Sequence, residues 1–291
     1  MVSSILTKLR EMGWGNELDD KDNQYALLPL RMHTLVRKPQ ELTDRIWNNI
    51  KQPLISILEE LKKKRLAAER VTAFKYRRNL VTVLLKDYEW RRHVAEVIPG
   101  PADVCSMDEF RTIIEDTDVD VEVCEESFKQ AMDRLPQLTT EWRLAKDAEL
   151  VCILNRDSNS LWHTPPPTND RSQLELATTI FRCKVCKAPI SYPRILVHSC
   201  LHAFRASLHN YGDPRFKLYQ DLNDEPWNFA GDRVGIDVRG MSAAWLVVSS
   251  CGLDPATTTA NEMDVLDARF ECLGCYDGIC GRLVMGWRVA V

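Results

Sequence analysis

The sequence predicts an α+β protein, in which a mainly helical N-terminal domain is followed by a mixed α/β C-terminal module stabilised by zinc. Apolar residues recur at helical spacing up to about residue 154. A polar segment with three consecutive prolines follows. Beyond it, two Cys-x-x-Cys pairs each come after a β-favouring run. We therefore expect a helical domain over residues 1–154, a linker over 155–172 and a Cys/His zinc-binding module over 173–291.

The helical domain is predicted to hold a short first helix and one long kinked helix. Ser3 precedes an apolar stripe that ends at Gly13, which is typical of a short amphipathic helix. Thr43 is the expected N-cap of the long helix, whose apolar pattern continues to about Arg92. Proline lacks the backbone N–H and crowds the preceding turn, so Pro53 should kink this helix.

Shorter helices are expected in the rest of this domain. The segment Ile98-Pro-Gly-Pro101 should end the long helix, and Ser106 with Glu109 has the spacing of a capping box. Pro136 is expected to separate one helical turn from a last helix over roughly 138–154.

Length and composition indicate an ordinary globular protein without a membrane segment. The chain has 291 residues, of which 45% are hydrophobic and 27% charged, and this is enough to bury a sizeable core. No run approaches the roughly 18 apolar residues of a membrane span, and the first ten residues lack the pattern of a secretory signal. Ten cysteines spread over a long chain favour metal binding over disulfides. We expect an intracellular protein of the cytoplasm or nucleus.

The first Cys-x-x-Cys pair carries the strongest signal for a metal site. Cys183 and Cys186 have the spacing at which two thiolates of a tight turn reach one ion, and His198 and His202 lie four residues apart, on one face of a helix. A Cys-Cys-His-His set suits tetrahedral Zn²⁺. Because Pro193 delays the start of that helix, His202 is the least secure ligand, and Cys200 is the alternative fourth ligand.

The second pair, Cys272 and Cys275, has an incomplete ligand set. Cys280 is the only further cysteine nearby, and no histidine follows it in the chain. Three arrangements remain open: an ion at the first site alone, two separate ions, or one ion held by all four cysteines of both pairs. In the last arrangement His198 and His202 would be ordinary helix residues.

The pattern favours a non-enzymatic protein whose zinc is structural and whose partner is another protein. Four protein ligands leave no open position for a reacting water, unlike a three-ligand catalytic site. No nucleophile elbow, phosphate-binding glycine loop or tight pair of acids accompanies the cysteines. Redox chemistry of the thioredoxin type would need the pair at a helix N-terminus, and Pro189 argues against that context.

Nucleic-acid binding is the alternative function. The basic residues between Lys62 and Arg78, together with Lys184 and Arg194, could contact phosphates. A solvated helix face is the simpler interpretation of the first group, since the formal net charge of −4 gives no general attraction to nucleic acids. A base-reading helix also needs polar residues before its first histidine, whereas residues 195–197 are apolar.

Several segments resemble a large group of uncharacterised fungal proteins, some of which are F-box-like. The similar segments are 42–50 (LTDRIWNNI), 114–117 (IEDT), 135–143 (LPQLTTEWR) and 181–186 (FRCKVC). The resemblance implies a second alternative function, as the substrate-adaptor part of an F-box-type ubiquitin ligase. In that group a histidine follows the second cysteine pair, past the positions of Trp287 and Arg288, so the resemblance implies that the second finger is truncated in this sequence. No F-box helix set is recognisable in this sequence.

Overall fold

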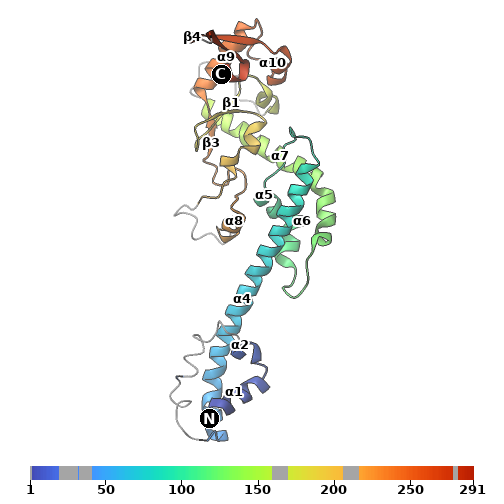
Figure 1. Cartoon of the computed structure of the whole chain (residues 1–291), viewed down its shortest axis with the longest axis vertical. Coiled ribbons are helices and arrows are strands. Elements are labelled where there is room, and N and C mark those ends of the chain that lie inside the picture. Colours follow the sequence, from blue (N-terminus) through green and yellow to red (C-terminus); the bar gives the residue numbers. More distant parts are fainter. Residues whose placement is uncertain (1, 20–31, 33–40, 159–169, 206–215, 278–280) are drawn as a thin grey trace. The chain divides into compact units, whose positions relative to one another are not determined.

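The computed structural model describes residues 2–19, 32, 41–158, 170–205, 216–277 and 281–291 (Figure 1). The fold is α+β, with long helices in the first part of the chain and small antiparallel sheets in the last part, as predicted. The chain forms two compact units, Met1–Phe74 and Lys75–Val291, here called the N-terminal and C-terminal units.

The N-terminal unit is a small helical cluster built on the first part of α4 (Asp44–Trp90). The helices α1 (Val2–Glu11) and α2 (Gly15–Asp19) precede it in the chain. As predicted, Thr43 accepts a hydrogen bond from a backbone N–H of the first turn of α4. The helix continues through Pro53, which lies in its third turn. The buried core of this unit consists of Ile5, Leu9, Leu18, Trp47, Ile50, Leu54, Leu58 and Leu61.

A second helical layer belongs to the C-terminal unit. It combines the end of α4 with α7 (Lys129–Ser158), and Figure 1 shows the shorter elements between them. Those elements are α5 (Pro101–Ser106), α6 (Asp108–Arg111), the π-helical turn η1 (Thr112–Asp116) and the 3₁₀ turn η2 (Glu125–Phe128). Their shared core consists of Val81, Leu85, Val104, Cys105, Phe110, Ile114, Val123, Phe128, Ala131, Leu135 and Leu138.

Two local predictions in this layer are wrong. Ser106 does not cap a helix; it ends α5 and donates a hydrogen bond to the carbonyl of Ala102 at 2.7 Å. Pro136 lies inside α7 instead of preceding it. Its neighbours Leu135 and Leu138 are both buried in the core, and this packing offsets the roughly 3 kcal/mol by which an interior proline disfavours a helix.

The buried side chain of Arg77 ties the π-helical turn to α4. Its guanidinium donates to the carbonyls of Ile114 and Thr117 at 3.0 and 2.8 Å, and to that of Asp118 at 2.6 Å. These carbonyls lie in the last turn of η1 and just beyond its end, where helical carbonyls lack partners within the helix. A buried cation is thus satisfied by backbone groups, which explains one residue of the basic run without any nucleic acid.

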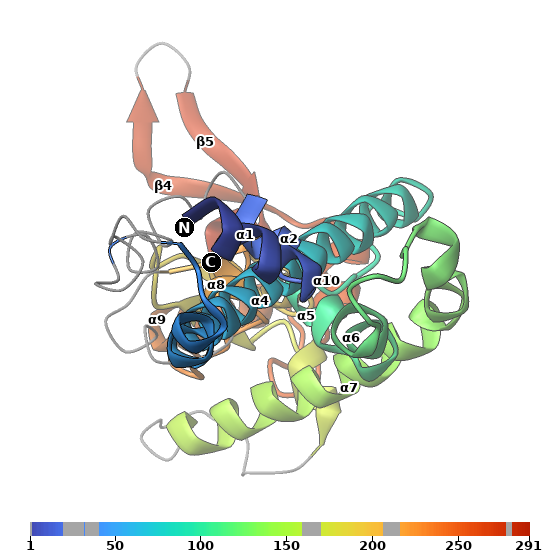
Figure 2. The same ribbon diagram turned by 90° about the horizontal axis from the view of Figure 1, so that it is seen from below.

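The last part of the chain contains a three-stranded antiparallel sheet and a separate hairpin. The sheet has the strand order β2-β1-β3, so β2 is an edge strand. Figure 2 shows the outer end of the β4–β5 hairpin projecting from the helices of the C-terminal unit. The strands are β1 (Ile180–Cys183), β2 (Pro189–Ser191), β3 (Val234–Ile236), β4 (Arg269–Asp277) and β5 (Gly281–Gly286).

Short helices connect these strands and cover the sheet. Thr259 and Glu262 form a reciprocal capping box at the start of α10, with both hydrogen bonds present. No described helix is long and apolar enough to cross a membrane. The connecting elements are η3 (Arg171–Glu175), η4 (Arg194–Val197), η5 (Ser199–Leu201), α8 (Phe216–Leu222), α9 (Val238–Ser250), α10 (Ala260–Leu266) and α11 (Trp287–Ala290).

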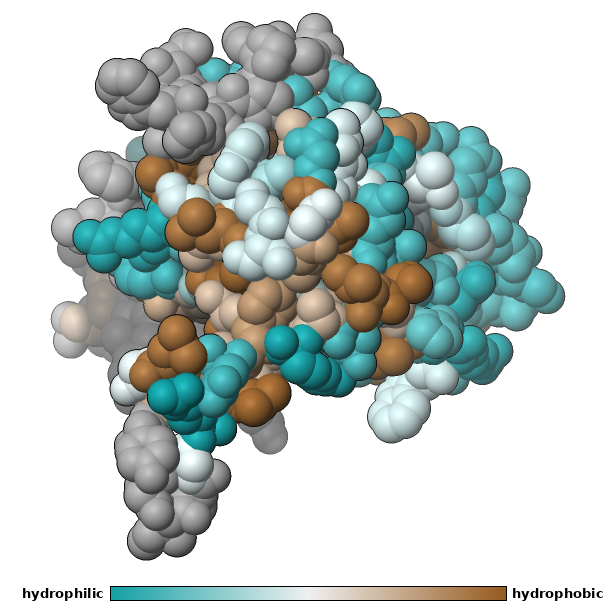
Figure 3. Space-filling model, turned by 90° about the horizontal axis from the view of Figure 1, so that it is seen from above, coloured by the Kyte–Doolittle hydropathy of each residue, from teal (hydrophilic) through white to brown (hydrophobic). Residues whose placement is uncertain are grey.

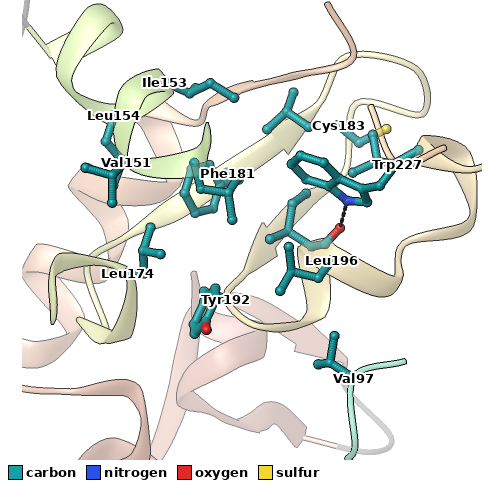
Figure 4. Packing of buried hydrophobic residues seen from close by; sticks show 14 of the residues in the cluster. Val97, Val151, Ile153, Leu154, Leu174, Phe181, Cys183, Tyr192, Leu196 and Trp227 are labelled. Carbon is teal, nitrogen blue, oxygen red and sulfur yellow. Dashed lines mark hydrogen bonds between the residues drawn. The ribbon is translucent and has the colours of Figure 1, made fainter. Parts of the chain in front are cut away.

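The structure divides the chain at a different place from the expected linker over 155–172. Helix α7 continues to Ser158, residues 159–169 lie outside the described part, and η3 begins at Arg171. The end of α7 shares one core with the sheet, in which Val151 and Leu154 pack with Phe181 (Figure 4). Because of this shared core, the end of the expected 1–154 domain and the 173–291 module fall in one unit.

Candidate metal centre

The first Cys-x-x-Cys pair forms a tight turn at the end of β1. Cys183 is the last residue of that strand; its N–H bonds the carbonyl of Ala188 at 3.0 Å, and its carbonyl accepts the N–H of Lys187 at 2.8 Å. Lys187 has a φ of 65°, in the left-handed region that closes such a turn. The backbone of Lys184 donates to Arg233 beside β3 at 2.8 Å. The two thiols are therefore positioned by the sheet.

The second half of the site comes from two 3₁₀ turns. His198 is the extended residue between η4 and η5, and Cys200 lies within η5. Apolar residues on both sides fix this segment, since Leu196 and Leu201 are fully buried. The indole N–H of Trp227 also donates to the carbonyl of Ile195 at 3.0 Å (Figure 4). The expected single helix bearing both histidines is not present.

Four potential ligand atoms lie close together, around a space that one metal ion could occupy. The Sγ atoms of Cys183, Cys186 and Cys200 and a ring nitrogen of His198 all lie within 4.8 Å of one another. The Sγ of Cys186 and the Nε2 of His198 are 3.3 Å apart. Zinc–sulfur bonds of about 2.3 Å place the thiolates of a tetrahedral site about 3.8 Å apart, so the group has the size of a zinc site. Three thiolates and one imidazole are a standard structural ligand set.

The surroundings of the group shift the pKa values of its members in different directions. The backbone N–H of Ala188 is the main cause that lowers the pKa of Cys186, and hydrogen bonds from the neighbouring thiols add to it. Burial, followed by the charge of His202, lowers the pKa of His198, which favours the neutral imidazole that binds metals. Burial raises the pKa of Cys200. A cation in the group would reverse that last effect, because a coordinated thiol is deprotonated.

His202, the expected fourth ligand, lies outside this group. Its Nε2 is 3.0 Å from the carbonyl oxygen of Leu196, and its Nδ1 is 3.5 Å from a carboxylate oxygen of Asp103. The chain forms two tight turns in place of one helix, so residues 198 and 202 do not share a face. Gly100 packs on the ring, where a Cβ would come within 2.9 Å of Nδ1. The structure thus puts Cys200 in the place first expected for His202.

A buried polar network supports the segment around the site. Glu225 and Arg233 form a buried ion pair, and the backbone N–H of Glu225 donates to the carbonyl of His202 at 2.6 Å. The carboxylate of Asp103 accepts the indole N–H of Trp142 at 2.9 Å and the backbone N–H of Trp227 at 3.0 Å. Glu225, Arg233 and Asp103 were not predicted from the sequence to support the site. Their partners are distant in the chain, so no local pattern marks them.

The second pair lies in the β4–β5 hairpin. Glu271 pairs with Val284 and Tyr276 with Arg282, so the four residues 272–275 of β4 lie opposite one residue of β5. This bulge brings Cys272 and Cys275 together, and hydrogen bonding between their thiols lowers the pKa of Cys272. Within the described residues, no third ligand joins them. Cys280 lies outside those residues, and the four-cysteine arrangement is not formed.

Comparison of the chain with protein-family models, with curated proteins and with solved structures finds no match in any of the three.

Proposed function

We propose that this chain is a non-enzymatic intracellular zinc-binding protein whose C-terminal unit is a protein-protein interaction module. The observation that carries the proposal is the convergence of Cys183, Cys186, His198 and Cys200, which could hold one metal ion. Thiolate and imidazole ligands in a compact four-membered group favour Zn²⁺ over the oxygen-seeking Mg²⁺ and Ca²⁺. Zinc would be structural, because all four positions are taken by side chains of the protein.

Two further observations support this function. The cysteines of the described residues are free thiols, as metal binding by Cys183, Cys186 and Cys200 requires. Figure 3 shows apolar side chains on the face of the C-terminal unit that is seen from above. Leu246, Val265 and Val289 are among the exposed apolar side chains of this unit. Exposed apolar side chains that gather on one face are typical of surfaces that bind other proteins. A role for the second cysteine pair as part of another zinc site belongs to the same proposal.

Metal analysis of the purified full chain tests the zinc assignment. Protein prepared without chelator should contain at least one equivalent of zinc, and removal of the metal should unfold the C-terminal unit while the helices of the N-terminal unit remain. Less than about half an equivalent would remove the basis of the proposal. Inductively coupled plasma mass spectrometry gives the metal content, and circular dichroism with and without chelator gives the structural response.

A further inference from the structure

A pocket of about 490 Å³ adjoins the candidate zinc site. It lies between the edge strand β2, the turn η4 and the helix α11, and His198 is part of its wall. Apolar side chains form another part of the lining, contributed by Ile180, Ile190 and Trp287. The pocket thus lies beside the strands and turns that position the candidate zinc ligands, and α11 forms another part of its wall.

Two arginine side chains line the pocket, and one of them is paired with an acidic residue. Arg194 and Arg288 both line it, and no acidic side chain is among its lining residues within the described chain. Arg288 is fixed by Asp264, whose two oxygens lie 2.9 and 2.7 Å from its Nε and Nη2, and it donates to Ser191 at 2.7 Å. Arg194 is exposed and has no ion pair with any described residue. One guanidinium is therefore anchored and the other is available to a ligand.

The pocket also borders an unpaired strand edge. Ile180 pairs with Ser191 but gives its carbonyl to the N–H of Asp237 on the other side of β1. The main-chain N–H and C=O of Ser191 must consequently point away from β1, where no further strand is found in this part of the structure. Such an edge can receive an extended peptide through backbone hydrogen bonds.

We propose that this pocket binds an extended acidic segment of a partner protein. An apolar side chain of the segment enters the pocket, and a neighbouring Asp or Glu pairs with Arg194. This inference rests on the proposed interaction function and names the class of partner. A protein fits better than a nucleic acid, because the lining is partly apolar and the exposed Val265 and Val289 follow Asp264 and Arg288 directly in the chain.

Selection of a random 12-residue peptide library displayed on phage, against the zinc-loaded full chain, tests the proposal. The selected peptides should share Asp or Glu next to an aliphatic or aromatic residue. A synthetic peptide of that sequence should bind the Arg194→Glu variant at least tenfold more weakly. The matched control is Arg239→Glu, which makes the same charge change at an exposed arginine of α9. Arg194→Lys should recover part of the affinity, because the positive charge is kept.

Three results would overturn the proposal. They are selection of peptides without acidic residues, equal weakening by Arg194→Glu and Arg239→Glu, and displacement of the peptide by a 12-nucleotide single-stranded DNA at equal concentration. Zinc content is measured in the same samples. Zinc-free protein would instead overturn the proposed function, whereas zinc-loaded protein that selects no acidic peptide overturns only the present inference.

Discussion

The two Cys-x-x-Cys segments share a motif and differ in what the fold builds around it. Cys183 is completely buried, and the turn it begins is held by the sheet and faces two further ligands. Cys275 is exposed on a hairpin, and Cys272 is the only other potential metal ligand beside it among the described residues. The local backbone, a turn at the end of β1 in one case and a bulge in β4 in the other, brings two thiols together in both places. What distinguishes a candidate zinc site is whether a distant segment supplies the other two ligands.

The largest expected effect comes from Cys183→Ser. Structural zinc in small domains contributes roughly 10–16 kcal/mol of apparent binding free energy, more than the whole stability of a typical domain. Loss of this thiolate should abolish zinc binding and unfold the C-terminal unit, which zinc analysis and thermal unfolding will record. Cys251→Ser, in the same unit but outside the group, is the control and should keep both zinc and the melting temperature.

The next comparison is between Cys200→Ser and His202→Ala. The first removes a ligand atom and should lower zinc affinity at least 100-fold in a competition titration with a chromophoric chelator. The second removes contacts with Leu196 and Asp103, so it should reduce the unfolding free energy by about 1–3 kcal/mol with zinc affinity nearly unchanged. The reverse ranking of the two affinities would return His202 to the ligand set.

Asp224→Asn tests the packing around His202 through its pH dependence. Burial raises the pKa of Asp224 to about 6, above the roughly 3.9 of an unfolded aspartate. The ionised carboxylate therefore destabilises the folded state once the pH exceeds about 6, and this effect disappears as the pH falls toward 4. Between pH 5 and 7.5 the unfolding free energy of the asparagine variant should rise relative to that of the natural chain by about 1.4 kcal/mol, measured in urea. A difference that does not change with pH would contradict this account.

The smallest effect is expected for Cys272→Ser. This residue lies on a hairpin outside the four-ligand group, so the unfolding free energy should change by no more than about 0.5 kcal/mol. The zinc bound by the first site should remain at one equivalent. Loss of that zinc would mean that one ion joins the two pairs.

Sequence reasoning worked where the signal is local. Helical periodicity and the cap at Thr43 predict α4, and the short spacing of Cys183 and Cys186 predicts a turn with converging thiols. It identified His198 as well, and Cys200 as the alternative to His202. It could not choose between the last two, because the choice depends on whether residues 194–202 form one helix or two 3₁₀ turns.

That choice is made by tertiary contacts. Leu196 and Leu201 are drawn into a core shared with α7 and with Trp227, and His202 turns toward Asp103 from a segment a hundred residues earlier. The same core places the end of α7 and the sheet in one compact unit. Periodicity reports which face of a helix is apolar, but it does not report which distant segment covers that face.

X-ray absorption at the zinc edge tests the central claim most directly. The sample is the zinc-loaded Cys272→Ser/Cys275→Ser double variant, in which the second pair cannot contribute. The account predicts three sulfur neighbours at about 2.3 Å and one nitrogen neighbour at about 2.0 Å, from Cys183, Cys186, Cys200 and His198. Two sulfur and two nitrogen neighbours would contradict this ligand set, because they would mean that His202 is a ligand in place of Cys200. A double variant that binds no zinc would also contradict it, because one ion would then be held by both cysteine pairs.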